Sequence, residues 1–345
     1  MWKILFPIAL LFLGVSGYNL VLSKAENDAL QQYCGTGMKI PSKYNRKVTN
    51  GLDTKFEDAP WTARVGMKEY VNRDRQGNYS TGVLISPRHV LTVWNNFRFY
   101  KHDDGTYRMQ YPDQTMINDR CEGTDYNMDT EFTTPMRVYF DLEGATYLHT
   151  VRKAVILEGC KDIKNENRPM LVELAEPLQH ERFKPICMDN SQKTWRHAKW
   201  LKFFGWGDYT IKGQDKKFLA ARLKNAACDS IETDVVCAST DMHVAMNWGD
   251  YGGSAITKIG DQLTLAGIYI DQRFERNGAP KDPSQSHTSY KFAHIANYAD
   301  KICEISGICR KSKTSKATTT TENGTNTHDI ESDDRNLHIN IFARS

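Results

Sequence analysis

The sequence has little net charge and no long basic run. Lysine and arginine together number 45 and aspartate and glutamate 42, which leaves a formal charge of +3 over 345 residues. No continuous stretch interleaves basic with aromatic residues. Proteins that bind nucleic acids concentrate positive charge on one element or face, so a nucleic acid is not the expected partner.

Long hydrophobic runs are also missing after the first residues. The N-terminal segment MWKILFPIALLFLGVSG has an apolar run from Ile4 to Val15, which follows one lysine and precedes small residues. This run is too short to cross a bilayer comfortably, and its pattern is typical of a secretory signal peptide cleaved near Gly17. We therefore expect residues 1–17 to be a signal peptide and the mature protein to be secreted, extracellular and free of the membrane.

Metal-binding motifs are absent too. The eight cysteines include no CxxC pair, and no group of residues has metal-ligand spacing. A zinc site is the rival interpretation of so many cysteines, but free thiols are disfavoured in a secreted chain. An even number of cysteines instead indicates disulfides, for which the sequence alone allows about a hundred pairings. We expect no metal and no other cofactor.

Short alternating apolar runs predict an antiparallel β-protein. They extend from residue 61 to about residue 178 and again from residue 199 to about residue 292. Residues 97–135 form a long polar insertion in the first stretch, and such insertions usually lie on the surface. The strands predicted in the first stretch are TARVGM, STGVLIS, HVLTVW, MRVYFDL, VRKAVIL and PMLVEL.

Two helices and one disordered segment complete this prediction. Residues 18–33 predict a short helix, with Ser23 and Glu26 spaced as a capping box. Residues 292–305, FAHIANYADKICEI, also have helical spacing. Residues 311–345 are rich in threonine, serine, asparagine and aspartate, so they cannot bury a core and are expected to be disordered. Potential N-glycosylation sites are Asn78 in NYS and Asn323 in NGT.

Residues 249–253, GDYGG, resemble GDSGG, the nucleophile loop of trypsin-like serine proteases. LISPRHVLTVWNN, residues 84–96, is similar to the segment in which that family carries its catalytic histidine. NRPMLVELAEPL, residues 167–178, is similar to the segment that carries the catalytic aspartate. The resemblance implies an all-β fold of two six-stranded antiparallel Greek-key barrels followed by a C-terminal α-helix.

Six motifs in order resemble a group of nematode secreted trypsin-like proteins over roughly residues 20–310. They are Cys34-Gly35, SPRHVLT from Ser86, Cys160 before PMLVEL, PICMD from Pro185, GDYGG, and Ile302–Cys309. The implied organisation is a propeptide-like segment at residues 18–47 and a double barrel at residues 48–310. Within the latter, the first barrel occupies residues 48–185, the second barrel residues 186–291, and the helix with its cysteine loop residues 292–310.

The resemblance implies that the catalytic triad is degenerate. The histidine position is Asn95, the aspartate position is Arg168 and the serine position is Tyr251. Acyl transfer of this type needs a nucleophile, a base and a carboxylate that stabilises the imidazolium. A tyrosine cannot replace the serine, because its phenol, with a pKa of about 10, stays protonated at neutral pH and its oxygen lies farther out. No catalytic residue is therefore expected.

The implied substrate site is altered as well. Backbone amides of Gly249 and Tyr251 stand where the oxyanion hole forms, and we expect the tyrosine ring to fill the space of a tetrahedral intermediate. Ala245 stands at the floor of the specificity pocket. Gln272 replaces a small glycine in the pocket wall, so the pocket is expected to be narrow.

The resemblance also implies an activation site. RKVTNG matches a basic residue followed by the new N-terminus, so cleavage after Lys47 would let Val48 pair with Asp250. The alternative is that Asp250 is retained as a turn residue that bonds nearby amides.

The same resemblance gives the cysteine pairing. It implies the pairs Cys34–Cys187, Cys228–Cys237, Cys303–Cys309 and Cys121–Cys160.

Two other residues invite a catalytic reading. His89 lies on a predicted strand and Ser254 follows the double glycine. We expect His89 to be a packed core histidine rather than a displaced base, and Ser254 not to act as a substitute nucleophile.

These features favour a secreted pseudoprotease, which is not an enzyme but a binding or regulatory module for a protein partner. A serine-type endopeptidase or other hydrolase with a non-standard set of catalytic residues is the first alternative. A structural glycoprotein that keeps the fold without a binding role is the second.

Overall fold

The structure is a computed structural model. It describes residues 21–38, 52–53, 56–67, 79–94, 99–101, 107–109, 120–142, 145–161, 168–179, 181–207, 217–228, 233–240, 246, 249–274 and 288–309. All of these belong to one compact unit, Met1–Lys311. Several predicted features lie outside the described residues. They are the signal peptide, the Lys47–Val48 site, the tail of residues 311–345, and the glycosylation sites Asn78 and Asn323.

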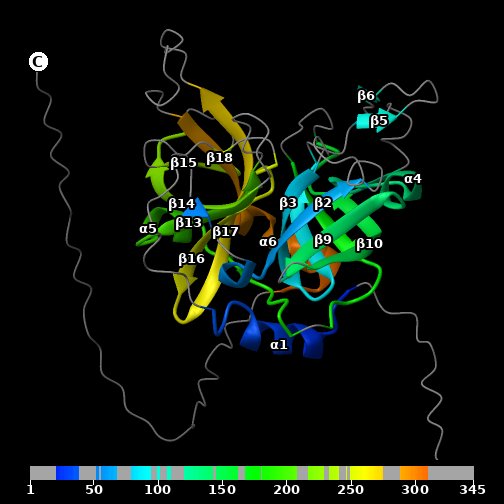
Figure 1. The fold of residues 1–345 in the computed structure, drawn as a ribbon, viewed down its shortest axis with the longest axis horizontal. Helices are drawn as coiled ribbons and strands as arrows, with labels where there is room; N and C mark the ends of the chain where they lie inside the picture. The colour runs from blue at the N-terminus through cyan, green and yellow to red at the C-terminus, as the bar shows by residue number, and fades with distance from the viewer. Residues whose placement is uncertain are drawn as a thin grey trace, which may run out of the picture. The chain divides into compact units, whose positions relative to one another are not determined.

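Two closed six-stranded antiparallel barrels build this unit, as the resemblance implied (Figure 1). In the first barrel the hydrogen-bonded order runs β2-β3-β4-β11-β10-β9, and β9 pairs with β2 to close it. The predicted strands match closely, except that β10 begins well before the predicted VRKAVIL. The strands are β2 (Thr62–Met67), β3 (Tyr79–Ser86), β4 (His89–Val93), β9 (Met136–Leu142), β10 (Ala145–Ile156) and β11 (Pro169–Leu174).

The second barrel has the order β13-β14-β15-β18-β17-β16, and β16 pairs with β13 to close it. Its interior is aromatic, with Phe203, Tyr269 and Phe292 in mutual ring contact at centroid separations of 5.8–6.3 Å. The strands are β13 (Leu201–Gly207), β14 (Lys217–Ala226), β15 (Val235–Thr240), β16 (Ser254–Ile259), β17 (Gln262–Phe274) and β18 (Thr288–His294).

Short elements extend the two sheets. Strand β1 adds to β14 and β12 adds in parallel to β17, while β5 and β6 pair only with each other. These elements and the short helices are β1 (Leu52–Asp53), η1 (Phe56–Asp58), β5 (Phe99–Lys101), β6 (Tyr107–Met109), α4 (Thr130–Thr133), β12 (Cys187–Met188) and α5 (Thr194–His197).

The polar insertion is only partly a surface feature. Its described C-terminal part forms β7 (Cys121–Glu122) and β8 (Asp125–Asn127), and β8 continues the first-barrel sheet by pairing with β10. Tyr126 and Asp125 are buried there. The expectation of a surface location is wrong for this part, because the disulfide to Cys160 draws the hairpin onto the barrel.

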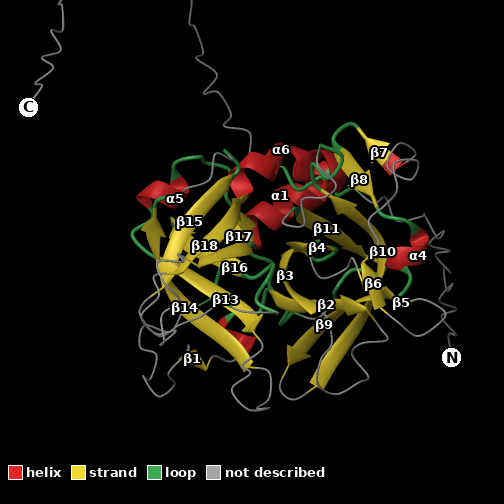
Figure 2. Cartoon of the chain, turned by 90° about the horizontal axis from the view of Figure 1, so that it is seen from above, coloured by secondary structure: helices red, strands yellow, loops and turns green. Residues whose placement is uncertain are grey.

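Helices α1 (Lys24–Tyr33) and α6 (Ile295–Ser306) lie at the same edge of the molecule (Figure 2). The predicted capping box of α1 is confirmed, since Ser23 and Glu26 bond each other's backbone amides. Helix α6 begins at residue 295 rather than 292, because the preceding three residues still pair as the end of β18.

Backbone and side-chain bonds connect the two ends of the described chain. The amide N–H of Leu22 donates to the carbonyl of Ser306. The Asn27 side chain donates to the carbonyl of Cys309 and accepts from its N–H, each at 3.1 Å.

Four disulfides link the described cysteines, in the same pairs that the resemblance implied. They are Cys34–Cys187, Cys121–Cys160, Cys228–Cys237 and Cys303–Cys309.

Candidate functional site

The GDYGG loop lies where the two barrels meet, immediately before β16. Thr81, in β3 of the first barrel, donates its N–H to the carbonyls of Gly249 and Tyr251, at 3.0 and 2.8 Å. The Thr81 hydroxyl donates to the carbonyl of Gly249 at 2.7 Å and accepts the N–H of Trp206 at 2.8 Å. One buried threonine therefore fixes the loop to both barrels.

Close packing accounts for the double glycine of this loop. Gly252 has φ of +83°, a conformation that favours glycine, and a Cβ there would lie 2.1 Å from the carbonyl oxygen of Thr81. A Cβ on Gly253 would lie 2.5 Å from the ring of Phe203. Gly252 is thus required by the contact between the barrels and Gly253 by packing inside the second barrel, whatever residue occupies the nucleophile position.

Asp250 is buried, and its carboxylate packs against GWG, the last three residues of β13. Cβ atoms on Gly205 and Gly207 would lie 2.6 and 2.5 Å from its two carboxylate oxygens. This geometry gives Asp250 a packing role that does not depend on a new N-terminus. Its expected partner, Val48, lies outside the described residues.

Tyr251 turns its ring into the second barrel. The side chain is 8% exposed and stacks on Tyr269, with ring centroids 5.0 Å apart and planes inclined by 10°. Tyr269 is fully buried and also contacts the ring of Tyr290. Burial, together with the neighbouring Tyr251 and Asp250, holds the pKa of Tyr269 well above its usual value. The loop thus presents a packed aromatic cluster.

Arg168 links the first barrel to α6 and the second barrel. Its guanidinium donates to the carboxylate of Asp234 at 2.8 Å and lies 3.5 Å from both Glu158 and the hydroxyl of Tyr298. The Tyr298 hydroxyl donates to the same Asp234 oxygen at 2.5 Å. Burial opposes the charge, but Tyr298, Asp234 and Glu158 outweigh it and raise the pKa of Arg168. The side chain is engaged in a structural ion pair.

The other predicted site residues are placed only in part. Asn95 and Ala245 lie outside the described residues, and so does the side chain of Gln272, whose backbone belongs to β17. Among the predicted site residues that are described, Gly249 and Tyr251 both accept from the N–H of Thr81, whereas Arg168 pairs with Asp234.

A family model provides the comparison that decides the relationship. The model of the nematode trypsin-6-like family matches residues 3–309. The chain belongs to this family. Membership agrees with the two-barrel trypsin-like fold and with the resemblance found in the sequence.

One curated relative of this chain is named as an enzyme. A protein named venom serine protease, from Polistes dominula, is 23% identical over 315 residues. The match covers 86% of this chain and 98% of that protein. At this identity the relative supports membership of the trypsin-like family, but its activity is not assigned to this chain.

Sequence reasoning missed the residues that contact Arg168 and Tyr251. Asp234 and Tyr298 come from segments 66 and 130 residues beyond Arg168, so no local pattern links them. Tyr269 was within reach of sequence reasoning, because it lies in GIYIDQ, the segment matched to the pocket wall. An aromatic residue there, facing a tyrosine in the loop, was the available signal.

The two rival catalytic residues are structural. Ser254 is fully buried and accepts the indole N–H of Trp61 at 3.1 Å. His89 is buried, and its Nδ1 lies 2.8 Å from the hydroxyl of Ser86. Ser86 in turn accepts the N–H of His89. Both side chains serve the fold.

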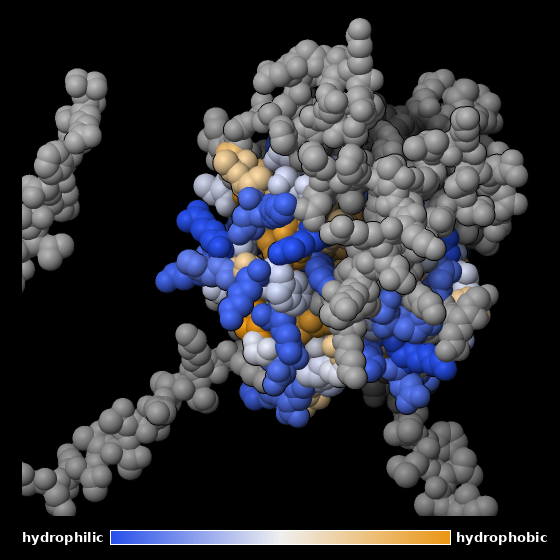
Figure 3. Space-filling view, turned by 60° about the vertical axis from the view of Figure 1, so that its left-hand side comes forward, coloured by the Kyte–Doolittle hydropathy of each residue, from blue (hydrophilic) through white to orange (hydrophobic). Residues whose placement is uncertain are grey.

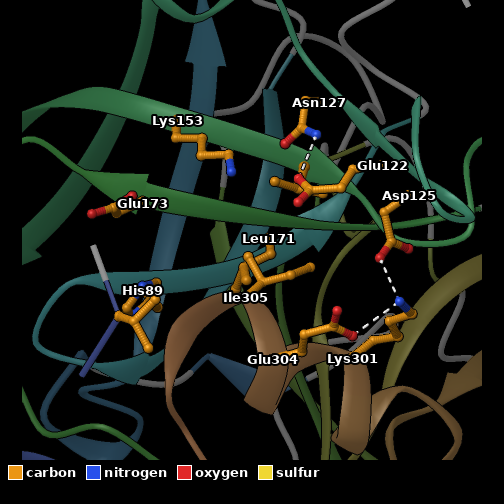
Figure 4. Close-up of a pocket in the computed structure, with 12 residues that line it drawn as sticks. His89, Glu122, Asp125, Asn127, Lys153, Leu171, Glu173, Lys301, Glu304 and Ile305 are labelled. Carbon is orange, nitrogen blue, oxygen red and sulfur yellow. Dashed lines mark hydrogen bonds and ion pairs between the residues drawn. The ribbon is translucent and has the colours of Figure 1, made fainter. Parts of the chain in front are cut away.

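A separate cavity of about 210 Å³ lies beneath α6 (Figure 4). It is lined by His89 and Glu173, and by Lys301, which pairs with Asp125 and Glu304 at 3.4 and 3.0 Å. Burial raises the pKa of Glu173 to about 7. None of the residues of the GDYGG loop lines this cavity.

Metal-binding clusters and membrane-spanning helices are absent from the described ranges. No group of three or more His, Cys, Asp or Glu side chains there could hold a metal ion. In those same ranges no helix is long and apolar enough to cross a membrane.

Proposed function

We propose that this protein is a secreted trypsin-like pseudoprotease that binds or regulates a protein partner. It lacks the serine, histidine and aspartate of the triad, because Tyr251, Asn95 and Arg168 occupy their positions. The four disulfides support secretion, since such bonds persist in oxidising compartments.

The packing of Tyr251 is the observation that carries this proposal. Its ring is committed to the stack with Tyr269 and is 8% exposed, so the group at the nucleophile position is not presented to a substrate. A nucleophile must lie within hydrogen-bond reach of a base and face the reacting carbonyl.

The environment of Arg168 supports the same conclusion. A catalytic aspartate at this position would have to face an imidazole, whereas Arg168 is held by Asp234 and Glu158. The surroundings have become complementary to a cation, so they disfavour the carboxylate that the reaction needs.

The test uses a fluorophosphonate probe on the full secreted chain, purified free of host proteases. We expect no labelling under conditions in which an active trypsin-like protease is labelled stoichiometrically. We expect the same of the triple variant Asn95→His, Arg168→Asp, Tyr251→Ser, because its new carboxylate faces Asp234. Stoichiometric labelling of the unaltered chain would contradict the proposal.

A working hydrolase is the second candidate, and the name of the Polistes dominula relative favours it. Hydrolysis of a peptide library at a rate proportional to protein concentration, and abolished by mutation of one residue of this chain, would establish it. Capture of one stoichiometric partner from secreted fluid by the inactive chain would instead support the pseudoprotease.

A further inference from the structure

One outer face of the second barrel collects basic side chains that are scattered in the sequence. Three segments form this face, residues 191–202, 220–226 and 256–261. Their single acidic residue is Asp261, which pairs with Lys258 at 3.2 Å. We call this surface the basic face. It consists of Lys193, Lys199, Lys202, Arg222, Lys224 and Lys258.

Strand pairing places these side chains next to one another. Lys202 in β13 lies directly opposite Arg222 in β14. Lys224 follows Arg222 by two residues, so both project from the same side of β14. Neighbouring strands lie about 4.8 Å apart and alternate residues about 6.7 Å apart, which sets the spacing of the charges.

Trp200, which immediately precedes β13, lies among these charges. Its carbonyl accepts the hydroxyl of Thr257 in β16 at 2.9 Å, which brings the strand of Lys258 alongside. The ammonium of Lys202 lies 5.8 Å from the centre of the indole ring. Trp200 is half-buried and so presents part of its ring to solvent.

A groove runs between α5 and the end of β16. Its volume is about 570 Å³. Lys193, Lys199 and Lys258 line it together with His197, and Trp200 and Ile259 supply an apolar part. In Figure 3, which turns the second barrel forward, hydrophilic side chains gather around small hydrophobic areas. The groove thus combines several cations with an apolar surface.

Several like charges lie close together on this face. Like charges directly opposite in a sheet destabilise the pair. Burial, and then the nearby Arg222, lower the pKa of Lys202. The whole chain carries only +3, so the basic face is a local asymmetry rather than the consequence of a basic protein. An extended polyanion would match the charge of this face.

We propose that the basic face binds a linear sulfated polysaccharide. Sulfate groups along such a chain are fully ionised and spaced on the scale of the paired strands, and a sugar ring can lie against Trp200. The disulfides place the protein in an oxidising compartment, where sulfated polysaccharides rather than nucleic acids are the extended polyanions. This site does not involve the GDYGG loop and does not depend on whether the chain is an enzyme.

The test measures binding of a fluorescent heparin oligosaccharide to the full disulfide-bonded chain. We expect the affinity to fall steeply with salt, because counterions are released when several cations contact a polyanion. The double variant Lys199→Glu, Lys258→Glu should bind at least about ten-fold more weakly. The control Lys24→Glu, Lys184→Glu makes the same change in net charge at exposed positions outside the face and should retain its affinity.

Two results would overturn the proposal. An equal loss in both double variants would mean that net charge, not the basic face, attracts the oligosaccharide. Binding of poly-glutamate or of a DNA oligonucleotide at least as tight as that of the oligosaccharide would reject a sulfated polysaccharide as the occupant. Circular dichroism of each variant verifies that the fold is retained.

Discussion

At the scale of single residues, the GDYGG motif has two separable roles. One is to present the residue at the nucleophile position, Tyr251, and the other is to pack the loop between the barrels against Thr81. Gly252 packs against the carbonyl of Thr81, and Asp250 packs against GWG at the end of β13. The first contact joins the barrels and the second holds the loop to its own barrel, and neither needs a reactive hydroxyl. A GDxGG motif can therefore persist when the residue at its centre has changed, because the neighbouring residues are held by packing.

Replacement of Tyr251 tests this separation. Tyr251→Ser removes a buried ring from its stack with Tyr269, so we expect the free energy of unfolding to fall by about 3 kcal/mol. Tyr251→Phe keeps the ring and should cost at most about 1 kcal/mol. Urea denaturation measures both. Equal stability of the serine variant and the parent would show that the stack does not stabilise the loop.

Arg168 gives the second prediction at this scale. Arg168→Asp puts a carboxylate beside Asp234 and Glu158 in a largely buried site, and we expect a loss of about 3 kcal/mol of stability. The charge-swapped double variant Arg168→Asp, Asp234→Arg should recover part of that loss, as judged from a double-mutant cycle. A swap no more stable than the single variant would indicate that the pair contributes little.

At the scale of elements, strand β11 carries an unusual buried charge. Glu173 lies opposite His89 of β4 and lines the cavity beneath α6. Burial raises its pKa from 4.5 to about 7, and the cations Arg152, Lys153 and Arg88 oppose this shift only partly. Below pH 4.5 the carboxyl is protonated in both the folded and the unfolded chain. Above pH 7 the folded chain must hold a buried carboxylate.

The consequence is a pH-dependent stability. Because the folded state binds the proton more tightly, the free energy of unfolding falls as the pH rises from 4.5 to about 7, by up to about 3 kcal/mol. We expect Glu173→Gln to stabilise the protein at pH 8 and to have little effect at pH 4.5. The exposed Glu176→Gln makes the same chemical change outside the cavity and serves as the control. Denaturation curves at the two pH values decide this, and a pH-independent effect of Glu173→Gln would refute it.

Sequence periodicity predicted these elements because their signals are local. TARVGM, MRVYFDL and PMLVEL coincide with β2, β9 and β11. The Ser23 capping box starts α1 at Lys24, later than the expected helix over residues 18–33, because Ser23 is its N-cap. The start of α6 was misplaced, because the apolar residues that end β18 continue smoothly into the helix. The lone charge of Arg168 gave no indication of Asp234, which folding brings to it from a distant segment.

At the scale of the whole molecule, long-range pairing creates properties that composition hides. The near-neutral sequence argued against a nucleic acid partner and gave no sign of a basic surface, yet β13, β14 and β16 bring Lys202, Arg222, Lys224 and Lys258 onto one face. Only the register of the sheet reveals this surface. Folding likewise places Tyr269 against Tyr251, and the aromatic residue in GIYIDQ was the sequence signal for this cluster.

The N-terminal segment gives the last prediction, since it is anchored at several points. Cys34–Cys187 binds it covalently, while Leu22 and Asn27 bond Ser306 and Cys309. We expect proteolysis after Lys47 to leave the N-terminal fragment attached under non-reducing conditions and to release it on denaturation with a reductant. Mass spectrometry under both conditions measures this, with the uncleaved chain as control. Under the proposed function no nucleophile stands in the GDYGG loop, so cleavage should not generate fluorophosphonate labelling. Release of the fragment without reductant would mean that the disulfide and the bonds to the C-terminal loop do not hold it.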